Sequence, residues 1–240
     1  MQLHILTHNI HKGVAPYTGR RTLTRLREEI RASQADIVFL QEVRGAHERE
    51  PQGPQQDFLA SAVWPDQAYG KNAVYRRGHH GNAILSKIPL LSHHNEDISL
   101  NRLERRGLLH AEARLPGART LHLFCLHLNL RKADRAQQLG RVIDHMEAGV
   151  GPNDSAILAG DFNDWQGLLS DRLEQALGYR EAGLVAQGRH AKTFPSLYPL
   201  LSLDRIYFRG LDLTAFKVLD GPRWRNLSDH LAMTATFKVP

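Results

Sequence analysis

The sequence predicts an α/β protein in which two mixed β-sheets pack face to face and helices cover the outside of each sheet. Several strand-like segments are apolar on both faces, and such strands need packing partners on both sides. Helical patterns separate some of these strands, whereas strands follow one another directly between residues 72 and 128. This mixture excludes a uniform strand–helix repeat and calls for antiparallel neighbours in the sheets.

The individual elements are predicted from the spacing of apolar residues. Strands are expected over residues 2–9, 36–43, 72–75, 82–86, 106–115, 119–128, 155–161, 203–209, 213–219 and 231–238. One apolar stripe predicts a helix that begins near Thr22 or Thr24 and reaches Ile30, and similar stripes follow Ala133 and Trp165. Helices therefore separate some of the strands.

Two segments are expected to form long loops. Residues 44–56 are rich in Gly, Pro, Gln and charge, and residues 186–202 carry two prolines. A Gly-rich turn over 78–82 is expected to hold His79 and His80, and His93–His94 show no functional pattern.

The composition of the 240 residues, 42% hydrophobic and 23% charged, is that of a folded chain, and we expect a single domain over 1–240. No segment approaches the roughly 18 consecutive apolar residues of a membrane span. The N-terminus enters a strand pattern at once, and Cys125 is the only cysteine, so no internal disulfide can form. These features favour a cytoplasmic protein, or one whose signal has been trimmed off, with Cys125 as core filler rather than a nucleophile.

The charge suits a polyanionic partner. The formal charge is +6 and the pI about 9.7, with arginine preferred to lysine. The basic residues that lie close in sequence to polar strand ends are Lys12, Arg76, Arg77, Arg105, Arg106, Arg131, Lys132, Arg223 and Arg225. They predict a basic rim around an acidic centre of the size of a metal ion; the alternative is that they are solubilising surface charges.

Asp161 and Asn163 follow the apolar run 156–159, which has the pattern of a buried strand. In an extended backbone these two residues face the same side. Asp161 could orient or deprotonate a water molecule, while Asn163 could donate to a phosphate oxygen. The alternative is a turn, in which Asp and Asn are both favoured.

Glu42 follows the wholly apolar run 37–40, so its carboxylate is expected to be partly buried and to need a partner. Together with Asn9 and Asp229 it supplies the hard oxygen ligands that Mg²⁺ prefers. The alternative for Glu42 alone is a solvated strand end.

Other polar strand ends carry an imidazole or a group that can orient one. His127 and Asn129 share one face of their strand, although a histidine among leucines is more often a core residue. Asp204 begins a strand and could hold an imidazole in one tautomer, and His230 neighbours Asp229. The histidines at positions 8, 11, 79 and 80 are expected to be mostly surface or supporting groups.

In order, Thr7–Ile10, Leu40–Val43, Gly81–Ser86, Leu126–Leu128, Gly160–Asn163, Leu203–Ile206 and Ser228–His230 resemble the endonuclease/exonuclease/phosphatase superfamily, whose fold is named after DNase I. The resemblance covers residues 3–238 and rests on the order and spacing of these motifs. It implies a four-layered α/β/β/α sandwich and attack of water on a phosphoester, assisted by Mg²⁺ or Mn²⁺.

The resemblance also implies roles for single residues. Glu42 matches the principal metal ligand, with Asn9 and Asp229 near the ion, and Asp161 matches the residue that positions or activates water. The remaining matches are Asn163 and His127 as phosphate ligands, His230 with Asp204 as the acid/base or charge-stabilising pair, and Arg106 and Asn129 as weaker candidates for a phosphate contact. Whether Asp161 or His230 is the general base stays open.

Departures from known subfamilies narrow the substrate. Abasic-site endonucleases typically carry a tryptophan where this chain has Leu201. Inositol-polyphosphate 5-phosphatases have an aromatic residue where this chain has Leu203 and an arginine where it has Trp165. The chain is more similar to short bacterial members, several of which are sphingomyelinase-like or of unassigned substrate. We therefore expect a phosphodiesterase acting on nucleic acid or a phospholipid headgroup, with peripheral contact to an anionic membrane possible and no obligate protein partner. The alternatives are a phosphomonoesterase on a phosphorylated lipid or small molecule, and a binding module with an inactive site.

Overall fold

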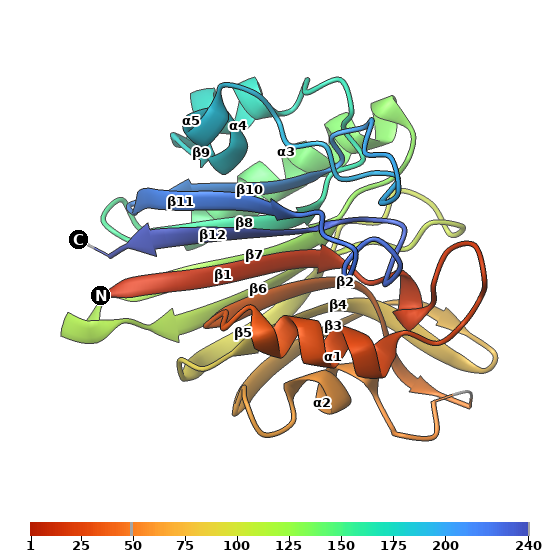
Figure 1. Ribbon diagram of the computed structural model, residues 1–240. Helices are drawn as coiled ribbons and strands as arrows, with labels where there is room; N and C mark the ends of the chain where they lie inside the picture. Colours follow the sequence, from red (N-terminus) through yellow and green to blue (C-terminus); the bar gives the residue numbers. More distant parts are fainter. Residues whose placement is uncertain (49, 240) are drawn as a thin grey trace.

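Two mixed β-sheets of six strands each pack face to face in the computed structural model, which describes residues 1–48 and 50–239 (Figure 1). The first sheet has the order β11 (Asp212–Leu219), β12 (Ala232–Lys238), β1 (Gln2–Asn9), β2 (Ile37–His47), β4 (Gly78–Ser86), β3 (Asp66–Tyr75). The second has the order β5 (Leu90–Asp97), β6 (Gly107–Arg114), β7 (Thr120–His127), β8 (Ser155–Asp161), β10 (Asp204–Arg209), β9 (Arg180–Glu181). The pairs β1–β2 and β7–β8 are parallel, and the other paired strands are antiparallel.

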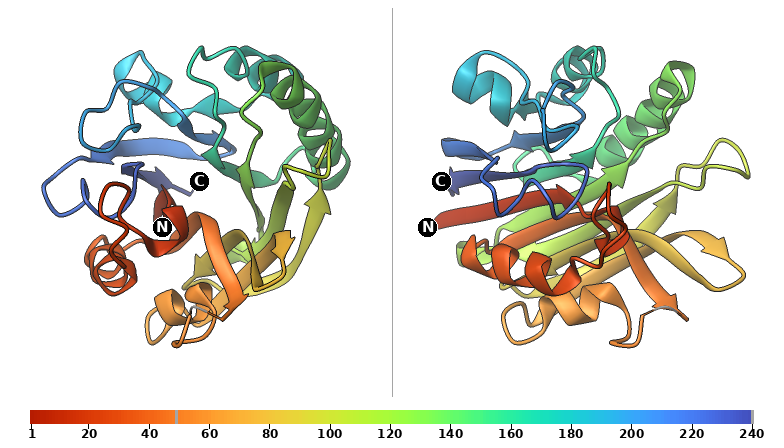
Figure 2. Two further views of the ribbon diagram at one scale, coloured as in Figure 1. Left: turned by 90° about the vertical axis from the view of Figure 1, so that its right-hand side faces the viewer. Right: turned by 45° about the vertical axis from the view of Figure 1, so that its right-hand side comes forward.

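Helices form the outer layers, as Figures 1 and 2 show. The helices α1 (Leu23–Ala32) and α2 (Gln55–Ala60) cover the first sheet, and α3 (Lys132–Gly149) and α4 (Ser170–Leu177) cover the second. The short helix α5 (Ala182–Gln187) packs against β10 and β11 and so closes one edge between the sheets. The predicted four-layered α/β/β/α fold is thus confirmed.

Strands buried on both faces explain the layering. Along β8, Ile157 and Ala159 point into the core between the sheets, whereas Ala156 and Leu158 point toward α3 and α4. Each fully buried leucine or isoleucine contributes about 1.5–3 kcal/mol, so a strand with apolar side chains on both faces is stable only between two layers. Cys125 lies in the core between the sheets, where burial raises the pKa of its thiol to about 12.

Several element boundaries differ from the prediction. The strand β2 continues to His47 and α2 begins at Gln55, so the expected loop 44–56 is shorter, and α5 extends into the expected loop 186–202. His79 and His80 lie in β4 rather than in a turn. The strands β5 and β9 were not predicted, because both lie at sheet edges and β5 is mostly exposed and polar, without an apolar alternation. None of the helices described is long and apolar enough to span a membrane.

Candidate active site

The strand β1 runs from the N-terminus toward the end of the sandwich opposite the chain termini (Figure 1), and Asn9, which ends it, lies with the other predicted site residues in one pocket. Asp161 at the end of β8 pairs in register with His127 of β7 on one side and with Asp204 of β10 on the other. In the facing sheet, Asn9 ends β1 and its amide reaches Glu42 of β2. Strand ends from both sheets therefore deliver polar side chains to one place.

These residues line a pocket of about 320 Å³. The predicted site residues in its wall are Asn9, Glu42, Arg106, His127, Asp161, Asn163, Asp229 and His230. Asp204 lies directly behind His230, and Asn129 lies behind Arg106. The structure thus brings together in one open pocket nearly all of the residues that the sequence singled out.

Glu42 owes its orientation to a β-bulge in β2. The register of β2 with β4 shifts between Leu40 and Val43, and Glu42 has a left-handed φ of 58°. A bulge of this kind turns one side chain away from the regular alternation. Gln41 therefore points between the sheets, where its amide contacts Cys125 Sγ at 3.3 Å, while Glu42 faces the pocket.

The Glu42 carboxylate forms an ion pair with Lys12. Lys12 Nζ lies 2.5 Å from Glu42 Oε2, and Asn9 Nδ2 lies 3.4 Å from Glu42 Oε1. Burial raises the pKa of Glu42, but neighbouring positive charge, including the Lys12 ammonium that is hydrogen-bonded to the carboxylate, outweighs burial and holds this pKa below its usual range. Glu42 therefore stays ionised and is suited to bind a positive ion.

Asp161 lies at the centre of a hydrogen-bond network. Its Oδ1 accepts from the backbone N–H of Asn163 at 2.9 Å, and its Oδ2 accepts from Asn9 Nδ2 at 3.0 Å. The same Oδ2 lies 3.4 Å from His127 Nε2 and 3.6 Å from His230 Nε2. Burial raises the pKa of Asp161 above its usual range, with His230 acting in the opposite direction. A carboxylate with a raised pKa is a better proton acceptor than an exposed aspartate.

His230 and Asp204 form a buried pair. His230 Nδ1 lies 2.9 Å from Asp204 Oδ2, which also accepts from Thr193 Oγ1 at 2.5 Å. Burial lowers the pKa of His230, but the charges of Asp204 and Asp161 outweigh burial and raise this pKa well above its usual range. His230 is therefore an imidazolium whose Nε2 points toward Asp161 at the pocket floor. Asp161, Asp204 and His230 each offer one potential ligand atom within 4.8 Å of the other two, but His230 Nδ1 and Asp204 Oδ2 are engaged with each other.

His127 and Asn163 complete the floor of the pocket. Burial and the positive charge of Arg106 lower the pKa of His127 well below its usual range, so this imidazole is neutral. Asn163 has a left-handed φ of 50°, and its Nδ2 donates to Leu128 O at 2.9 Å. The expected extended geometry is therefore wrong: Asn163 lies in a turn that closes over Asp161, which was the alternative interpretation.

Asp229 reaches the pocket from the loop before β12. Ser228 Oγ donates to Asn9 O at 2.6 Å and lies 3.2 Å from Asp229 Oδ1, which fixes this loop to the end of β1. His11 Nδ1 lies 3.9 Å from the same Asp229 oxygen. Asp229 is thus held at the mouth of the pocket with its carboxylate partly exposed.

Asn129 supports Arg106 instead of facing the pocket. It is fully buried, and its Oδ1 accepts from Arg106 Nε at 3.3 Å and from Gln138 Nε2 at 3.1 Å. Its Nδ2 donates to Asp134 Oδ2 at 3.1 Å. The expected direct phosphate contact of Asn129 is therefore not supported, because its polar side-chain atoms are engaged, whereas Arg106 lines the pocket.

A second hollow continues from the pocket through Arg106. It measures about 500 Å³ and is lined by Lys71, Asn72, Val74, Asn95, Asp97, Arg102, Arg105 and Arg106. We refer to it as the basic hollow. Of the predicted basic rim, Arg105 and Arg106 lie in this wall and Lys12 lies in the active site, whereas Arg223 and Arg225 pair with acidic residues outside the pocket.

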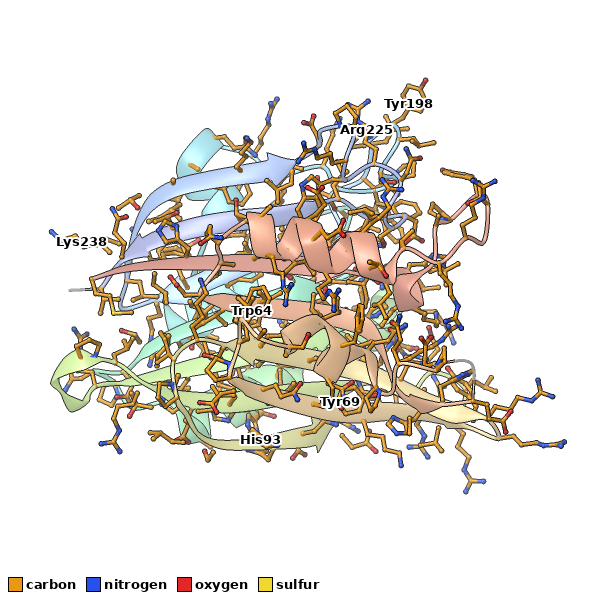
Figure 3. The ribbon with its side chains drawn as sticks, turned by 60° about the horizontal axis from the view of Figure 1, so that its bottom comes forward. Trp64, Tyr69, His93, Tyr198, Arg225 and Lys238 are labelled. Atoms are coloured by element: carbon orange, nitrogen blue, oxygen red, sulfur yellow. The ribbon has the colours of Figure 1, made fainter. Side chains whose placement is uncertain are left out.

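The opposite wall of the pocket is apolar. Leu130, Trp165 and Leu201 line it and are 60%, 47% and 38% exposed. Phe194 lines it too, with its ring 5.0 Å from the ring of His230. Tyr198 projects from the same loop as Phe194 at this end of the molecule (Figure 3). A flat or apolar group next to a phosphate would fit between these side chains.

Some supporting residues gave no signal in the sequence. Thr193 holds Asp204 from inside an expected loop, and no local pattern identifies it. His8, expected to be mostly a surface or supporting group, is 1% exposed; its Nε2 lies 3.1 Å from His230 O and its ring packs against Trp224. Its role in positioning His230 could be found only from the folded chain.

The fold and the site define a DNase I-like protein of the phosphoesterase type, and comparisons with known proteins agree. A profile of the Endonuclease/Exonuclease/phosphatase family matches residues 6–230, so the chain belongs to this family. The chain is 41% identical over 243 residues to the "Uncharacterized protein YbhP" of Escherichia coli K12, covering 98% of this chain and 96% of that protein.

Solved structures share the fold at low sequence identity. An endonuclease/exonuclease/phosphatase from Beutenbergia cavernae is 21% identical with a TM-score of 0.80, covering 99% of this chain and 72% of that one. The D. rerio TDP2 complexed with single strand DNA product is 19% identical with a TM-score of 0.75, covering 99% of both chains. At these identities the likeness establishes the fold alone.

Proposed function

We propose that this protein is a divalent-metal-dependent phosphodiesterase that uses water to cleave its substrate, with residues 1–240 acting as one catalytic domain. The observation that carries the proposal is the arrangement of one pocket, with an ionised Glu42 on one wall and Asp161 beside the His230–Asp204 pair at its floor. Such a pocket combines a cation ligand, a proton acceptor and a fixed positive charge.

The donor set fits Mg²⁺ or Mn²⁺. Hard divalent ions prefer carboxylate and amide oxygens, and the carboxylates of Glu42 and Asp229 line the pocket. Asn9 lines it too, with its Nδ2 toward Glu42 and Asp161 and its Oδ1 accepting from the backbone N–H of His11 at 3.1 Å. The ammonium of Lys12 on Glu42 Oε2 supports a cation position at this carboxylate. We assign Glu42 as the principal ligand, with Asn9 and Asp229 beside it. When bound, the ion would neutralise charge on the phosphate and act as a Lewis acid.

Asp161 is the proposed acceptor of the proton from water. It is buried and has a raised pKa, and the Asn163 and Asn9 hydrogen bonds fix the directions of its two oxygens. His230 is not suited to this role, because the aspartates on either side of its ring keep it protonated. This difference in charge state supports Asp161 as the base.

His230 instead stabilises negative charge that develops on the phosphate. Its Nδ1 is engaged by Asp204, so the imidazolium can donate from Nε2 in one fixed direction. The neutral His127, Asn163 and the guanidinium of Arg106 line the same pocket and supply further contacts to phosphate oxygens.

The surroundings favour a nucleic acid substrate. The basic hollow adjoins the pocket, and Arg106 lines both, so cationic side chains lie beyond the pocket where neighbouring phosphates of a nucleic acid could bind. On the other side, Trp165 and Phe194 present ring surfaces on which a base could stack. The apolar wall also favours a second candidate, a phospholipid headgroup, because Leu130 and Leu201 are exposed at the pocket mouth.

Turnover by purified protein tests this function. The protein should hydrolyse single-stranded DNA or RNA in Mg²⁺ or Mn²⁺ and lose this activity in EDTA, and Asp161→Asn should abolish it. Parallel reactions with phosphatidylcholine and sphingomyelin vesicles and with phosphomonoesters separate the candidates. Headgroup release without cleavage of nucleic acid would reject the nuclease branch, and release of inorganic phosphate alone would identify a phosphomonoesterase.

A further inference from the structure

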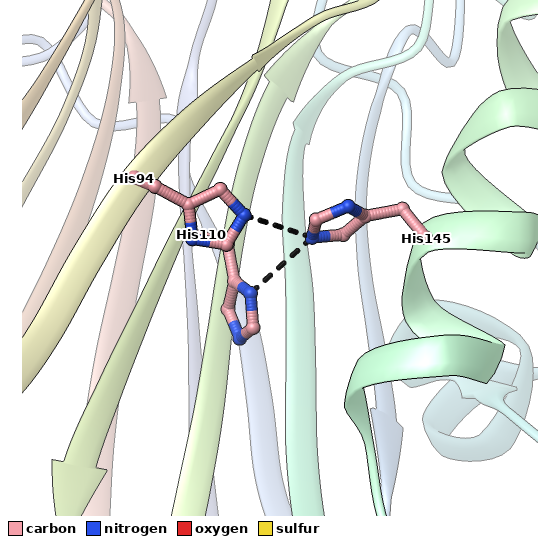
Figure 4. A group of neighbouring side chains, drawn as sticks. All are labelled: His94, His110 and His145. Carbon is pink, nitrogen blue, oxygen red and sulfur yellow. Dashed lines mark hydrogen bonds between the residues drawn. The ribbon is translucent and has the colours of Figure 1, made fainter.

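Histidines from three elements gather on the outer face of the second sheet, away from the active site. His94 of β5 and His110 of β6 lie opposite each other in the register of these antiparallel strands, and His145 of α3 lies over them. Figure 4 shows the three rings pointing toward one another. At about 3.3 Å per residue, His110 lies roughly 13 Å along the chain from Arg106 of the catalytic pocket.

The distances between the ring nitrogens match the coordination shell of a metal ion. His145 Nε2 lies 3.2 Å from His94 Nε2 and 3.3 Å from His110 Nδ1, and all three nitrogens lie within 4.8 Å of one another. A tetrahedral zinc ion with Zn–N bonds of about 2.0–2.1 Å separates its ligand nitrogens by roughly 3.3–3.4 Å. Two of the three nitrogen–nitrogen separations thus match those of ligands on a single ion, and the third is no longer than 4.8 Å.

Hydrogen bonds alone account poorly for this convergence. A ring nitrogen of a neutral imidazole is either a donor or an acceptor, so His145 Nε2 must either donate to both His94 and His110 or accept from both. Neutral imidazole is the form that binds metal, and one ion would use the lone pairs of all three rings.

The surroundings of His110 resemble those of a metal-bound histidine. Its Nε2 lies 3.0 Å from His122 Nδ1, and His122 Nε2 lies 3.5 Å from Asp154 Oδ2. A chain of this kind fixes the tautomer that leaves His110 Nδ1 free to bind a metal, and makes the ring more basic. The ring of Phe124 stacks on His110 at 4.2 Å and holds its orientation.

We propose that His94, His110 and His145 bind a transition metal ion such as Zn²⁺, with His122 and Asp154 as orienting partners. Three imidazoles select Zn²⁺, Co²⁺, Ni²⁺ or Cu²⁺ over Mg²⁺, so this site differs chemically from the oxygen-rich catalytic pocket. The fourth coordination position opens to solvent, because His94 is exposed. The ion would tie the edge strand β5 to β6 and α3 and so stabilise this edge of the sheet.

Calorimetric titration of the full-length, chelator-treated protein with Zn²⁺ in millimolar Mg²⁺ tests the proposal. The wild type should bind one equivalent that His94→Gln and His145→Gln each weaken by at least 100-fold. His93→Gln is the matched control, since His93 is the next residue on the same strand, pairs with Ala111 and is exposed (Figure 3). It should bind Zn²⁺ as the wild type does.

Two further measurements separate this site from the catalytic pocket and from surface chelation. Glu42→Gln should retain the equivalent that His145→Gln loses, and Asp154→Asn should weaken it about 10–100-fold through the orienting chain. At a Zn²⁺ concentration 100 times the Kd, the folding equilibrium constant of the wild type should rise about 100-fold. Nitrogen NMR of the imidazoles should place the metal on Nε2 of His94 and His145 but on Nδ1 of His110.

Two results would overturn the proposal. One is Zn²⁺ binding that is the same in the wild type, His94→Gln and His145→Gln. The other is a loss of binding in His93→Gln equal to that in His94→Gln, which would indicate adventitious surface chelation. Since His94 is exposed, its replacement does not depend on repacking the core, so the test stands even where substitution of His110 prevents folding.

Discussion

Replacing Asp204 by asparagine tests whether Asp204 and His230 act as one unit. Asp204 is 1% exposed, and its Oδ2 is engaged by His230 Nδ1 and Thr193 Oγ1. Within the part of the chain that the structure describes, its Oδ1 is buried without a hydrogen-bond partner. The carboxylate charge is thus balanced mainly by the imidazolium of His230.

The expected loss follows from the burial of this pair. Removing one partner of a buried ion pair leaves the other charge uncompensated at a cost of about 3–5 kcal/mol. That cost falls on folding; the loss in kcat follows from losing the fixed imidazolium, and removal of one such charge-stabilising donor lowers kcat by roughly 10²- to 10³-fold. The pKa of His230 should also fall, so the variant should lose proportionally more activity at alkaline than at neutral pH.

A double-mutant cycle provides the assay. Turnover of the preferred substrate is measured for the wild type, Asp204→Asn, His230→Ala and the double variant, with urea unfolding to verify that each is folded. Within one catalytic unit the second substitution adds little to the first. The exposed Asp220→Asn is the matched control and should leave kcat within twofold of the wild type. If the double variant loses the sum of the two single losses in free energy, the two residues act independently.

Three further predictions concern other parts of the molecule. Glu42→Gln should raise the Mg²⁺ concentration required for turnover and lower kcat by several powers of ten, and unchanged activity at low Mg²⁺ would remove Glu42 from the site. Arg102→Ala and Arg105→Ala should each reduce the slope of log K against log salt for DNA binding by about one unit, as measured by fluorescence anisotropy; an unchanged slope would exclude a phosphate contact. Burial lowers the pKa of His8 from 6.5 to about 4, so its contribution to stability is complete above pH 6.5. About 3 kcal/mol of that contribution is lost as pH falls from 6.5 to 4. In denaturant unfolding at pH 7 and pH 5, His8→Gln should therefore lose less stability at the lower pH than the wild type does. The same loss in both proteins would contradict this role of His8.

The sequence alone was sufficient to predict the two-sheet architecture. Apolar residues on both faces of a strand require a packing layer on each side. This requirement follows from the strand's own sequence, so it can be predicted without knowing which elements pack against the strand. The prediction from sequence failed for β5, because an edge strand that is mostly exposed and polar shows no regular pattern of apolar residues. The candidate catalytic residues were also predictable, since a carboxylate or imidazole that ends an apolar strand needs a partner.

The chemistry of the site was decided by tertiary structure. Periodicity assigns a side chain to a face, but the register of neighbouring strands decides which side chain it meets. The sequence left the base open between Asp161 and His230, and our proposal of Asp161 rests on the fold, which places Asp204 beside Asp161 in the register of β8 with β10 and against the ring of His230. Likewise, the bulge in β2 places Glu42 in the pocket beside Lys12.

The histidine cluster shows most clearly that the sequence alone does not predict which distant side chains meet. His94 and His145 are 51 residues apart, and neither is distinguished from the other histidines by its local sequence. Their convergence depends on the β5–β6 register and on the packing of α3 over the sheet. Local sequence determines the faces of strands and helices, whereas the meeting of distant side chains is fixed by how these faces pack, because packing optimises the whole core at once.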